Sequence, residues 1–289
     1  MYKSEQFLTR TEALIKRLED ILLSAVPTTD WDTTIACRWR SQRGRSFFQP
    51  IVHLPTIQFS DLRHIDRQKT LIEQNTHQFI RGLPANNVLL TGSRGTGKSS
   101  LIHACLNRFS LQGLRLIEVD KNDLQDLGDI VEQITSRPER FIIFCDDLSF
   151  EKSESSYKAL KVVLDGSMAT QSDNVLIYAT SNLRNLLPGC IRDNETYRFA
   201  SDGEIHPGEV VEEKMSLSER FGLWVSFHPF KQDDYLAIVA HWLMHFSCSD
   251  TDINIARSDA LVWALERGSR SGRVAWQFAR DWAGRHQKT

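Results

Sequence analysis

The amino-acid sequence predicts an α/β fold in which helices cover both faces of a parallel sheet, followed by a small all-helical domain. Short apolar runs alternate with helix-like segments through the middle of the chain, as they do in parallel sheets. A glycine-rich loop separates the first apolar run from a helix-like segment, and strand signals stop after Pro229. We therefore expect an N-terminal helical extension over residues 1–55, an α/β core over 56–229 and a helical lid over 230–289.

Bulk composition excludes several classes of protein. The 289 residues are enough for a substantial core, and a net charge of −2 provides no overall basic field to attract nucleic acid. No apolar run approaches the roughly 18 residues that span a bilayer, so we expect no membrane insertion. The N-terminus lacks a signal-peptide pattern, and the five cysteines are scattered without C-x-x-C spacing. These features predict a cytoplasmic protein.

The N-terminal part is predicted to be a helix followed by a loop. Residues 5–25 carry apolar side chains at helical spacing, and Pro27 ends the pattern. A polar, loop-like segment then extends to about residue 55 and contains four arginines around Trp39, namely Arg38, Arg40, Arg43 and Arg45. Such a cluster can grip a nucleic-acid backbone, or it can be a solvated or intersubunit surface. A capped helix over 60–81 is expected to lead into the core.

Residues 92–99 form a complete G-x-x-x-x-G-K-[ST] phosphate-binding loop. They follow an apolar run at 87–91 and precede a helix-like segment at 100–106, which is the strand–loop–helix setting that the motif requires. A chance glycine turn is the alternative, and this setting disfavours it. The candidate nucleotide-binding residues here are Gly92, Ser93, Arg94, Gly95, Thr96, Gly97, Lys98, Ser99 and Ser100. Lys98 is expected to reach the β- and γ-phosphates, and the Ser99 hydroxyl to ligate Mg²⁺.

A second motif lies further along the chain, where the apolar run 141–145 ends in Asp146 and Asp147. A hydrophobic strand that delivers a carboxylate at its C-terminal end is the Walker B arrangement, which predicts Asp146 as a Mg²⁺ ligand. Asp147 is expected to activate the attacking water, although many ATPases carry the longer Glu at this position. The alternative is a pair of aspartates that only ends a strand in solvent.

The remaining pattern predicts further strands and helices. Strands are expected at 116–119, 175–179 and 223–227, and core helices at 123–136 and 154–167. The stretch between Asn182 and Ser216 is rich in Asn, Asp, Gly and Pro, which predicts a long functional or mobile loop. Three helices are expected in the lid, at 232–247, 252–267 and 272–285.

Three polar residues after the Walker B motif complete a candidate catalytic site. Asn182 ends a predicted strand near Asp146 and resembles sensor 1 of AAA+ proteins, which holds the attacking water; a simple turn former is the alternative. Arg220, in a helix-like segment at 217–223, resembles the arginine finger that AAA+ proteins insert into a neighbouring subunit's ATP site, although a surface arginine remains the alternative. Arg273 resembles sensor 2, the lid arginine, and Arg270 competes for that role.

From about residue 56 to 285, the chain resembles an uncharacterised bacterial family of predicted AAA+ ATPases, described as a domain of unknown function. The resemblance lies in the phosphate loop and in residues 64–69, 144–151, 179–182, 206–209 and 220–223. It implies an AAA+ P-loop core with a helical lid. The Asp146–Asp147 pair and the Arg-Phe-Gly-Leu junction are also similar to replication initiators and helicase loaders. His64 stands where many AAA+ proteins have Gly beside the adenine pocket, and the adjacent Ile65 is a candidate nucleotide contact.

The resemblance and the motifs together predict an AAA+ ATP hydrolase that binds ATP and Mg²⁺ between core and lid. The expected catalytic residues are Lys98, Asp147, Asn182 and Arg220. Hydrolysis is expected at a subunit interface of a homo-oligomer, where it changes the conformation of an unidentified protein or nucleic-acid partner. Two alternatives stay open: a nucleic-acid-directed loader or initiator that uses residues 38–45, and an ATP-gated scaffold that hydrolyses slowly.

Overall fold

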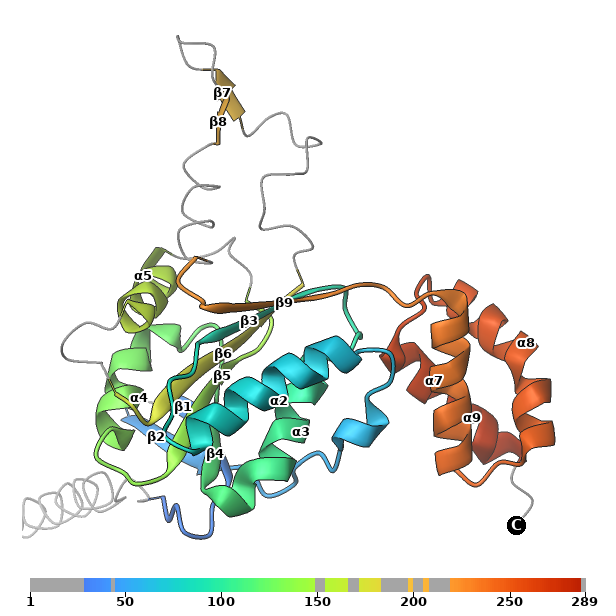
Figure 1. Ribbon diagram of the computed structural model, residues 1–289, viewed down its shortest axis with the longest axis horizontal. Coiled ribbons are helices and arrows are strands. Elements are labelled where there is room, and N and C mark those ends of the chain that lie inside the picture. Colours follow the sequence, from blue (N-terminus) through green and yellow to red (C-terminus); the bar gives the residue numbers. More distant parts are fainter. Residues whose placement is uncertain are drawn as a thin grey trace, which may run out of the picture.

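The computed structural model describes residues 29–42, 45–148, 154–165, 172–182, 197–199, 205–207 and 219–286. Its centre is a seven-stranded sheet in the order β2-β1-β4-β5-β6-β3-β9 (Figure 1). The strands are β1 (Ala36–Gln42), β2 (Arg45–Pro50), β3 (Val88–Gly92), β4 (Leu114–Val119), β5 (Arg140–Cys145), β6 (Val175–Ser181) and β9 (Leu223–Phe227). All neighbours pair in parallel except β1 with β2. The carboxyl ends of the parallel strands therefore share one edge, where ligands bind in such sheets.

Helices cover both faces of this sheet, as the alternating sequence predicts. Helices α2 (Asp66–Ile80) and α3 (Lys98–Phe109) pack on one face, while α4 (Leu127–Ile134) and α5 (Glu154–Leu164) pack on the other (Figure 1). Successive side chains of a strand point to opposite faces, so Ile142 joins the core under α2 and α3 while Ile143 joins the core under α4 and α5. The apolar run that predicts β5 is thus a strand buried on both sides.

The prediction of a polar loop before residue 55 is wrong for residues 36–50, which form β1 and β2. Cys37 and Trp39 are buried and alternate with Arg38 and Arg40, which gives the period of two of a half-buried strand. Trp39 is 0% exposed, and its indole N–H donates to the Asp126 carboxylate at 2.9 Å. The sheet therefore begins before the predicted boundary at residue 55. The expected helix over 5–25 lies outside the described residues.

Two predicted helices have different limits in the structure. The helix expected over 60–81 is a short 3-10 turn, Phe59–Asp61, followed by α2. The break between them contains His64, whose φ of 60° is incompatible with a continuous α-helix. The helix expected over 123–136 likewise consists of a 3-10 turn, Leu124–Asp126, and α4. Each break divides a predicted helix into a short 3-10 turn and a separate α-helix.

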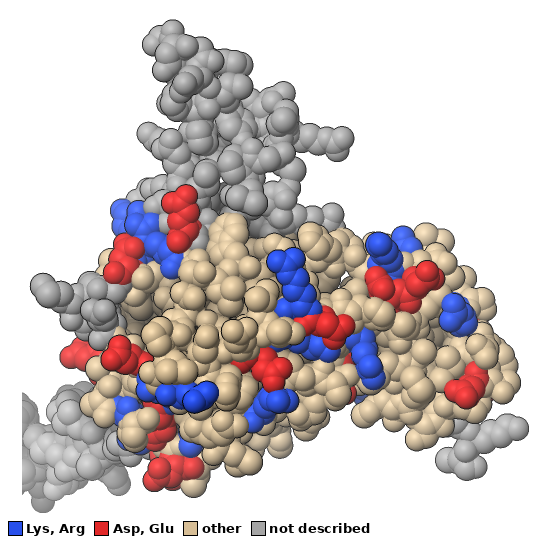
Figure 2. Space-filling view, in the orientation of Figure 1, with Lys and Arg blue, Asp and Glu red and all other residues tan. Residues whose placement is uncertain are grey.

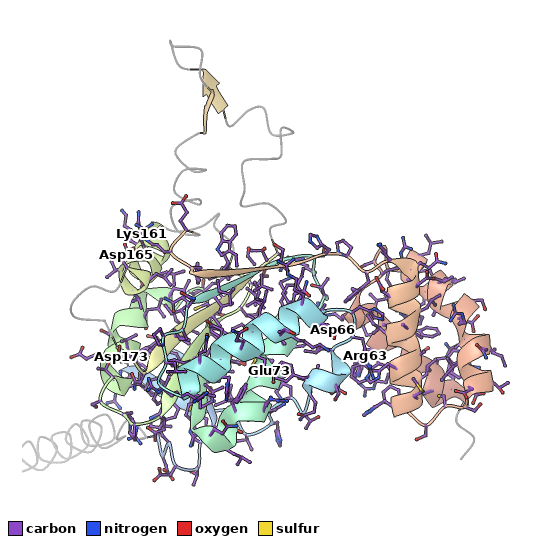
Figure 3. All side chains as sticks on the ribbon, viewed as in Figure 1. Arg63, Asp66, Glu73, Lys161, Asp165 and Asp173 are labelled. Atoms are coloured by element: carbon purple, nitrogen blue, oxygen red, sulfur yellow. The ribbon has the colours of Figure 1, made fainter. Side chains whose placement is uncertain are left out.

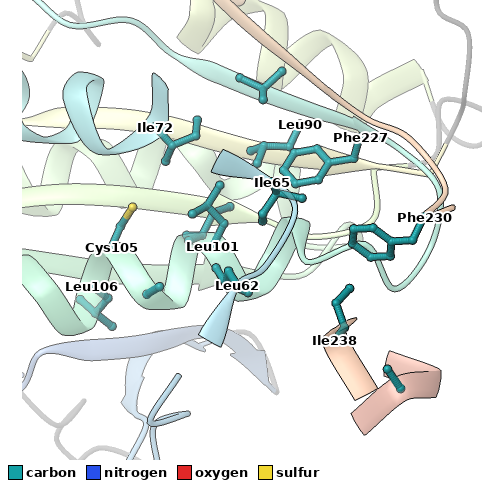
Figure 4. Packing of buried hydrophobic residues seen from close by; sticks show 14 of the residues in the cluster. Leu62, Ile65, Ile72, Leu90, Leu101, Cys105, Leu106, Phe227, Phe230 and Ile238 are labelled. Carbon is teal, nitrogen blue, oxygen red and sulfur yellow. The ribbon is translucent and has the colours of Figure 1, made fainter. Parts of the chain in front are cut away.

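The lid consists of α7 (Gln232–His245), α8 (Asp250–Glu266) and α9 (Gly272–His286), which lie to one side of the sheet (Figure 1). Tyr235, Phe278 and Trp282 fill its centre, so the helices bury their own apolar surface. This core is continuous with the one under α2 and α3. Figure 4 shows the junction, where Ile65 and Phe230 of the core lie close to Ile238 of α7. The lid is thereby seated against the core through side-chain packing.

Part of the segment predicted as a long loop carries a small sheet, in which β7 (Tyr197–Phe199) pairs antiparallel with β8 (Ile205–Pro207). The rest of residues 183–215 lies outside the described part of the chain. Among the described residues, none of the helices has both the length and the apolar character needed to cross a membrane.

Candidate functional site

The phosphate loop connects β3 to α3 at the carboxyl edge of the sheet, as predicted from its motif. Gly92 has a φ of 123°, and a Cβ at this position would lie 1.9 Å from the Phe227 carbonyl oxygen of β9. Gly97 has a φ of 100° and directly precedes α3. Only glycine permits both the left-handed backbone and the close approach, so the loop curls tightly ahead of the helix N-terminus. Such a loop points backbone N–H groups at a bound anion.

The Lys98 side chain folds back along this loop and is 5% exposed. Its ammonium donates to the carbonyl oxygens of Gly92 at 2.7 Å and Ser93 at 2.8 Å, and to the Asn182 side-chain oxygen at 3.0 Å. Burial lowers the pKa of Lys98 to about 8, although the carboxylates of Asp146 and Asp147 act in the opposite direction. The ammonium is therefore held by three acceptors in a partly desolvated position.

The two aspartates follow β5 at the same edge. The Ser99 hydroxyl donates to Asp146 Oδ1 at 2.8 Å, which places the two predicted Mg²⁺ ligands side by side. The Asn182 amide donates to Asp147 Oδ1. Asn182 thus contacts both Lys98 and Asp147, and five of the predicted residues converge at the end of the sheet. Thr180 of β6, for which the sequence predicts no role, contacts both aspartates.

A cleft of about 1060 Å³, here called the core–lid cleft, contains these residues. Its lining includes the phosphate loop and both aspartates. The same cleft is also lined by apolar and aromatic side chains, among them Leu62, Ile65, Ile238, Trp242 and Phe246. Ile65 packs beneath the loop, since a Cβ on Gly97 would lie 3.5 Å from its Cδ1. The loop groups and the apolar side chains that share this cleft suit the phosphates and the base of a nucleotide, respectively.

The two lid arginines line different clefts. Arg273 lines the core–lid cleft, and its backbone N–H donates to the Gly95 carbonyl oxygen at 3.4 Å. Arg270 instead lines a second cleft of about 1130 Å³, together with Arg94 and Lys121. Asp147 and Asn182 border both clefts. The geometry therefore separates two arginines that the sequence places only three positions apart.

Side-chain pairs also join the core to the lid, and two of their members, Asp61 and Arg63, line the core–lid cleft. The His64 imidazole lies 3.1 Å from the Asp234 carboxylate of α7. The Arg63 guanidinium lies 3.3 Å from His241 Nδ1, and the Asp61 carboxylate lies 3.7 Å from His241 Nε2. Arg63 and Asp66 are labelled at this junction in Figure 3. These contacts hold the lid against the segment that lines the cleft.

Arg220 lies outside both clefts. Residues 219–222 form a turn and bend before β9, so the predicted helix does not extend over this part, and residues 217–218 are outside the described chain. The Arg220 guanidinium pairs with the Asp165 carboxylate at the end of α5. Asp165 lies on the far side of the core from the lid helices (Figure 3). Arg220 is therefore remote from the core–lid cleft of its own chain.

The residues present fit a magnesium–nucleotide complex. Ser99 and Asp146 offer hard oxygen ligands next to the loop. Within the described residues, no group of three His, Cys, Asp or Glu side chains could hold a metal ion by itself. Mg²⁺ is usually bound by one or two carboxylates together with water and substrate phosphates, which matches such a small protein ligand set.

Comparisons with known proteins identify one matching family and several solved structures with a similar fold. A family model described as a protein of unknown function (DUF815) matches residues 32–286, a range that includes β1 and β2. A search of curated proteins finds no match. A RuvB mutant structure from Thermotoga maritima is 14% identical with a TM-score of 0.53, and covers 78% of this chain and 65% of its own.

An Orc1 structure from Aeropyrum pernix, solved in complex with DNA, is also 14% identical with a TM-score of 0.53, and covers 78% of this chain and 62% of its own. This chain thus spans less than two thirds of the length of either neighbour. At this level of identity, the likeness shows a shared fold, that of the AAA+ ATPases.

Proposed function

The chain belongs to the DUF815 family, and from that premise and its AAA+ fold we propose that it binds Mg·ATP between core and lid and hydrolyses it. The observation that carries this proposal is the convergence of Lys98, Ser99, Asp146 and Asp147 on the core–lid cleft. Each of these groups has the chemistry that phosphoryl transfer needs, and phosphoryl transfer depends mainly on positioning and electrostatic stabilisation.

In the proposed complex, the loop amides and Lys98 hold the phosphates. Ser99 and Asp146 hold Mg²⁺, which supplies charge neutralisation to the β- and γ-phosphates. Arg273 approaches from α9, and Ile65 is one of the apolar lining residues expected to contact the base. The present bonds of Lys98 to two loop carbonyls are then exchanged for bonds to phosphate oxygens.

Hydrolysis is assigned to Asp147 and Asn182. The Asp147 carboxylate accepts a proton from water while the water oxygen bonds to the γ-phosphorus. The bond between that phosphorus and the β–γ bridging oxygen breaks, leaving ADP and inorganic phosphate. The hydrogen bond between Asn182 and Asp147 supports this division, because the amide orients the carboxylate next to the expected γ-phosphate. Asp147 is one methylene shorter than Glu, so its placement must be tightly controlled.

A subunit interface is proposed because Arg220 cannot serve its own cleft. Its position beside Asp165, away from the lid, is compatible with action on a neighbouring copy. The second cleft provides an approach to Asp147 and Asn182 from outside the chain. We therefore propose a homo-oligomer in which Arg220 of one subunit completes the ATP site of the next.

The partner macromolecule is proposed only as a class. The loader alternative assigned residues 38–45 to a nucleic-acid strand, but Trp39 is buried and Arg38 pairs with Glu118 at 2.7 Å. Figure 2 also shows acidic and basic side chains interspersed on the face in view. These observations disfavour a stacking platform at β1. The Orc1 neighbour was solved with DNA, so we keep nucleic acid as a second candidate beside a protein partner.

The direct test measures ATP binding and phosphate release for the wild-type protein and for Lys98→Ala. The variant should lose tight ATP binding by about 10- to 100-fold, the effect of a hydrogen bond to a charged group. Arg257→Ala, an exposed change on α8, is the matched control and should bind ATP as wild type does. Unchanged affinity in Lys98→Ala would remove the proposed site. Tight Mg·ATP binding without turnover in the wild type would favour the ATP-gated scaffold.

A further inference from the structure

Thr180 occupies a buried position between the two aspartates. The β5–β6 register pairs Phe144 with Tyr178 and Cys145 with Ala179, so the next residues, Asp146 and Thr180, lie side by side. Thr180 is 2% exposed, and its carbonyl oxygen accepts the Leu148 N–H at 2.7 Å. The residues before and after Asp147 therefore both lie against β6: Asp146 is next to Thr180, and the Leu148 N–H donates to the Thr180 carbonyl oxygen.

The Thr180 hydroxyl makes two hydrogen bonds whose directions are determined by chemistry. The Asp147 backbone N–H can only donate, so Thr180 Oγ1 accepts at 2.9 Å. The single hydroxyl proton is then free to donate to Asp146 Oδ1, at 2.5 Å. One side chain thus holds the backbone of one aspartate and the carboxylate of the other.

At Asp146, this bond supplements the one from Ser99. Both hydroxyls donate to Oδ1, so the carboxylate is held at one oxygen from two elements, α3 and β6. Among the described residues, no further hydrogen bond engages Oδ2, which leaves that oxygen for a cation. A carboxylate oriented in this way by neighbouring groups needs little rearrangement to bind a metal.

At Asp147, the bond holds an unusual backbone conformation. Asp147 has a φ of 52°, in the left-handed region that residues other than glycine seldom adopt. Thr180 holds its N–H and Asn182, two residues further along, holds its carboxylate. The residue proposed as the base is therefore attached to β6 at both its backbone and its side chain.

We propose that Thr180 is a positioning residue. It fixes the position of the metal-binding carboxylate of Asp146 relative to the carboxylate of Asp147, the proposed general base. The proposal rests on the ATP hydrolysis proposed above and adds a residue to that site. Thr180 acts through the aspartates and leaves the phosphate contacts to the loop. Its hydroxyl, more than its size, is what the site requires.

The test compares Thr180→Val, which keeps the shape and removes the hydroxyl, with Thr180→Ser, which keeps the hydroxyl. ATP binding without Mg²⁺ should be unchanged in both, because the loop is intact. In Thr180→Val, kcat and the apparent Mg²⁺ affinity should each fall by about 10- to 100-fold, the usual effect of losing a group that orients a metal ligand. The KM for ATP should change less than kcat, and Thr180→Ser should recover most of the loss.

A matched control is Thr76→Val, which removes another buried threonine hydroxyl, one that donates to the Ile72 carbonyl oxygen on α2. It should keep the wild-type Mg²⁺ dependence even if it lowers the melting temperature. If Thr180→Val does not fold, Thr180→Cys takes its place, since a thiol fills similar space but is a weak donor.

Two results would overturn the proposal: a folded Thr180→Val with wild-type kcat and Mg²⁺ dependence, or a Thr180→Ser as impaired as Thr180→Val. If the wild type binds Mg·ATP without turnover, the proposed hydrolysis fails instead. Thr180 is then judged on the Mg²⁺ dependence of ATP binding alone. An unchanged dependence in Thr180→Val would reject its role there as well.

Discussion

The side-chain oxygen of Asn182 accepts a hydrogen bond from the Lys98 ammonium at 3.0 Å. The amide nitrogen of the same side chain donates to Asp147, so Asn182 links the group expected to hold the phosphates with the group expected to activate water. The two loop carbonyls occupy the remaining donors of Lys98. If a nucleotide phosphate binds Lys98 as proposed, it should displace protein acceptors from the ammonium, and Asn182 connects that exchange to Asp147.

The first prediction concerns the pH dependence of ATP affinity. The pKa of Lys98 is lowered to about 8 from an ordinary 10.5, mainly by burial. Bound phosphate should stabilise the ammonium and raise this pKa, so ATP binding should take up a proton at pH values above about 8. Affinity should accordingly fall as pH rises above 8.

Titration calorimetry in two buffers of different ionisation enthalpy measures this uptake directly. Lys98→Arg is the control, because a guanidinium stays charged throughout this range and should show little uptake. Proton release on binding in the wild type, or affinity that rises with pH, would contradict the expected state of Lys98.

The second prediction separates the two aspartates. Asp147→Asn should keep Mg·ATP binding and slow hydrolysis by about tenfold or more, because an amide is a far weaker base than a carboxylate. Asp146→Asn should instead weaken the Mg²⁺ dependence of ATP binding, since it removes the charged ligand beside Ser99. Mg²⁺ titrations of ATP binding and single-turnover rates distinguish the two. Equal wild-type turnover in both variants would show that the assignment is wrong.

The third prediction concerns Arg220. Arg220→Ala should leave ATP binding nearly intact and reduce hydrolysis, by as much as about 10³–10⁵-fold if it acts as arginine fingers do elsewhere. Mixing it with Lys98→Ala subunits should restore part of the activity, because some interfaces then combine an intact loop with an intact arginine. Recovery should increase with protein concentration as subunits assemble.

Asp165→Asn is the control for the local structure around Arg220, since it weakens the ion pair but retains the guanidinium. It should hydrolyse ATP at close to the wild-type rate. A mixture that stays inactive while light scattering detects mixed oligomers would exclude action between subunits. So would a proven monomer whose turnover per subunit does not depend on concentration.

The fourth prediction distinguishes the two lid arginines. Arg273 lines the core–lid cleft and Arg270 lines the second cleft. Arg273→Ala should therefore lower ATP affinity by about tenfold, the effect of one charge-assisted hydrogen bond. Arg270→Ala should lower it much less, as measured by equilibrium binding of a fluorescent ATP analogue. The reverse order of effects would assign the sensor 2 role to Arg270.

The phosphate loop and the Walker B strand are predictable because both are local. A dozen residues contain the glycines, the lysine and the flanking strand and helix, and no distant contact is needed to form the loop. The same holds for β5, whose short, uninterrupted apolar run is typical of a strand buried on both faces. The sequence by itself therefore determined which edge of the sheet carries the phosphate loop and the two aspartates, and the alternation of strands and helices around it.

Tertiary structure decided what depends on register and packing. Trp39 looks like part of a basic loop in the sequence, but packing against Phe48 and the segment around Leu124 and Asp126 buries it in the core. Thr180 has no motif of its own, and only the β5–β6 register places its hydroxyl between the two aspartates. Arg270 and Arg273 line different clefts because of how the lid packs against the core. Each of these outcomes arises from contacts between residues far apart in the chain, whose burial and pairing no local pattern encodes.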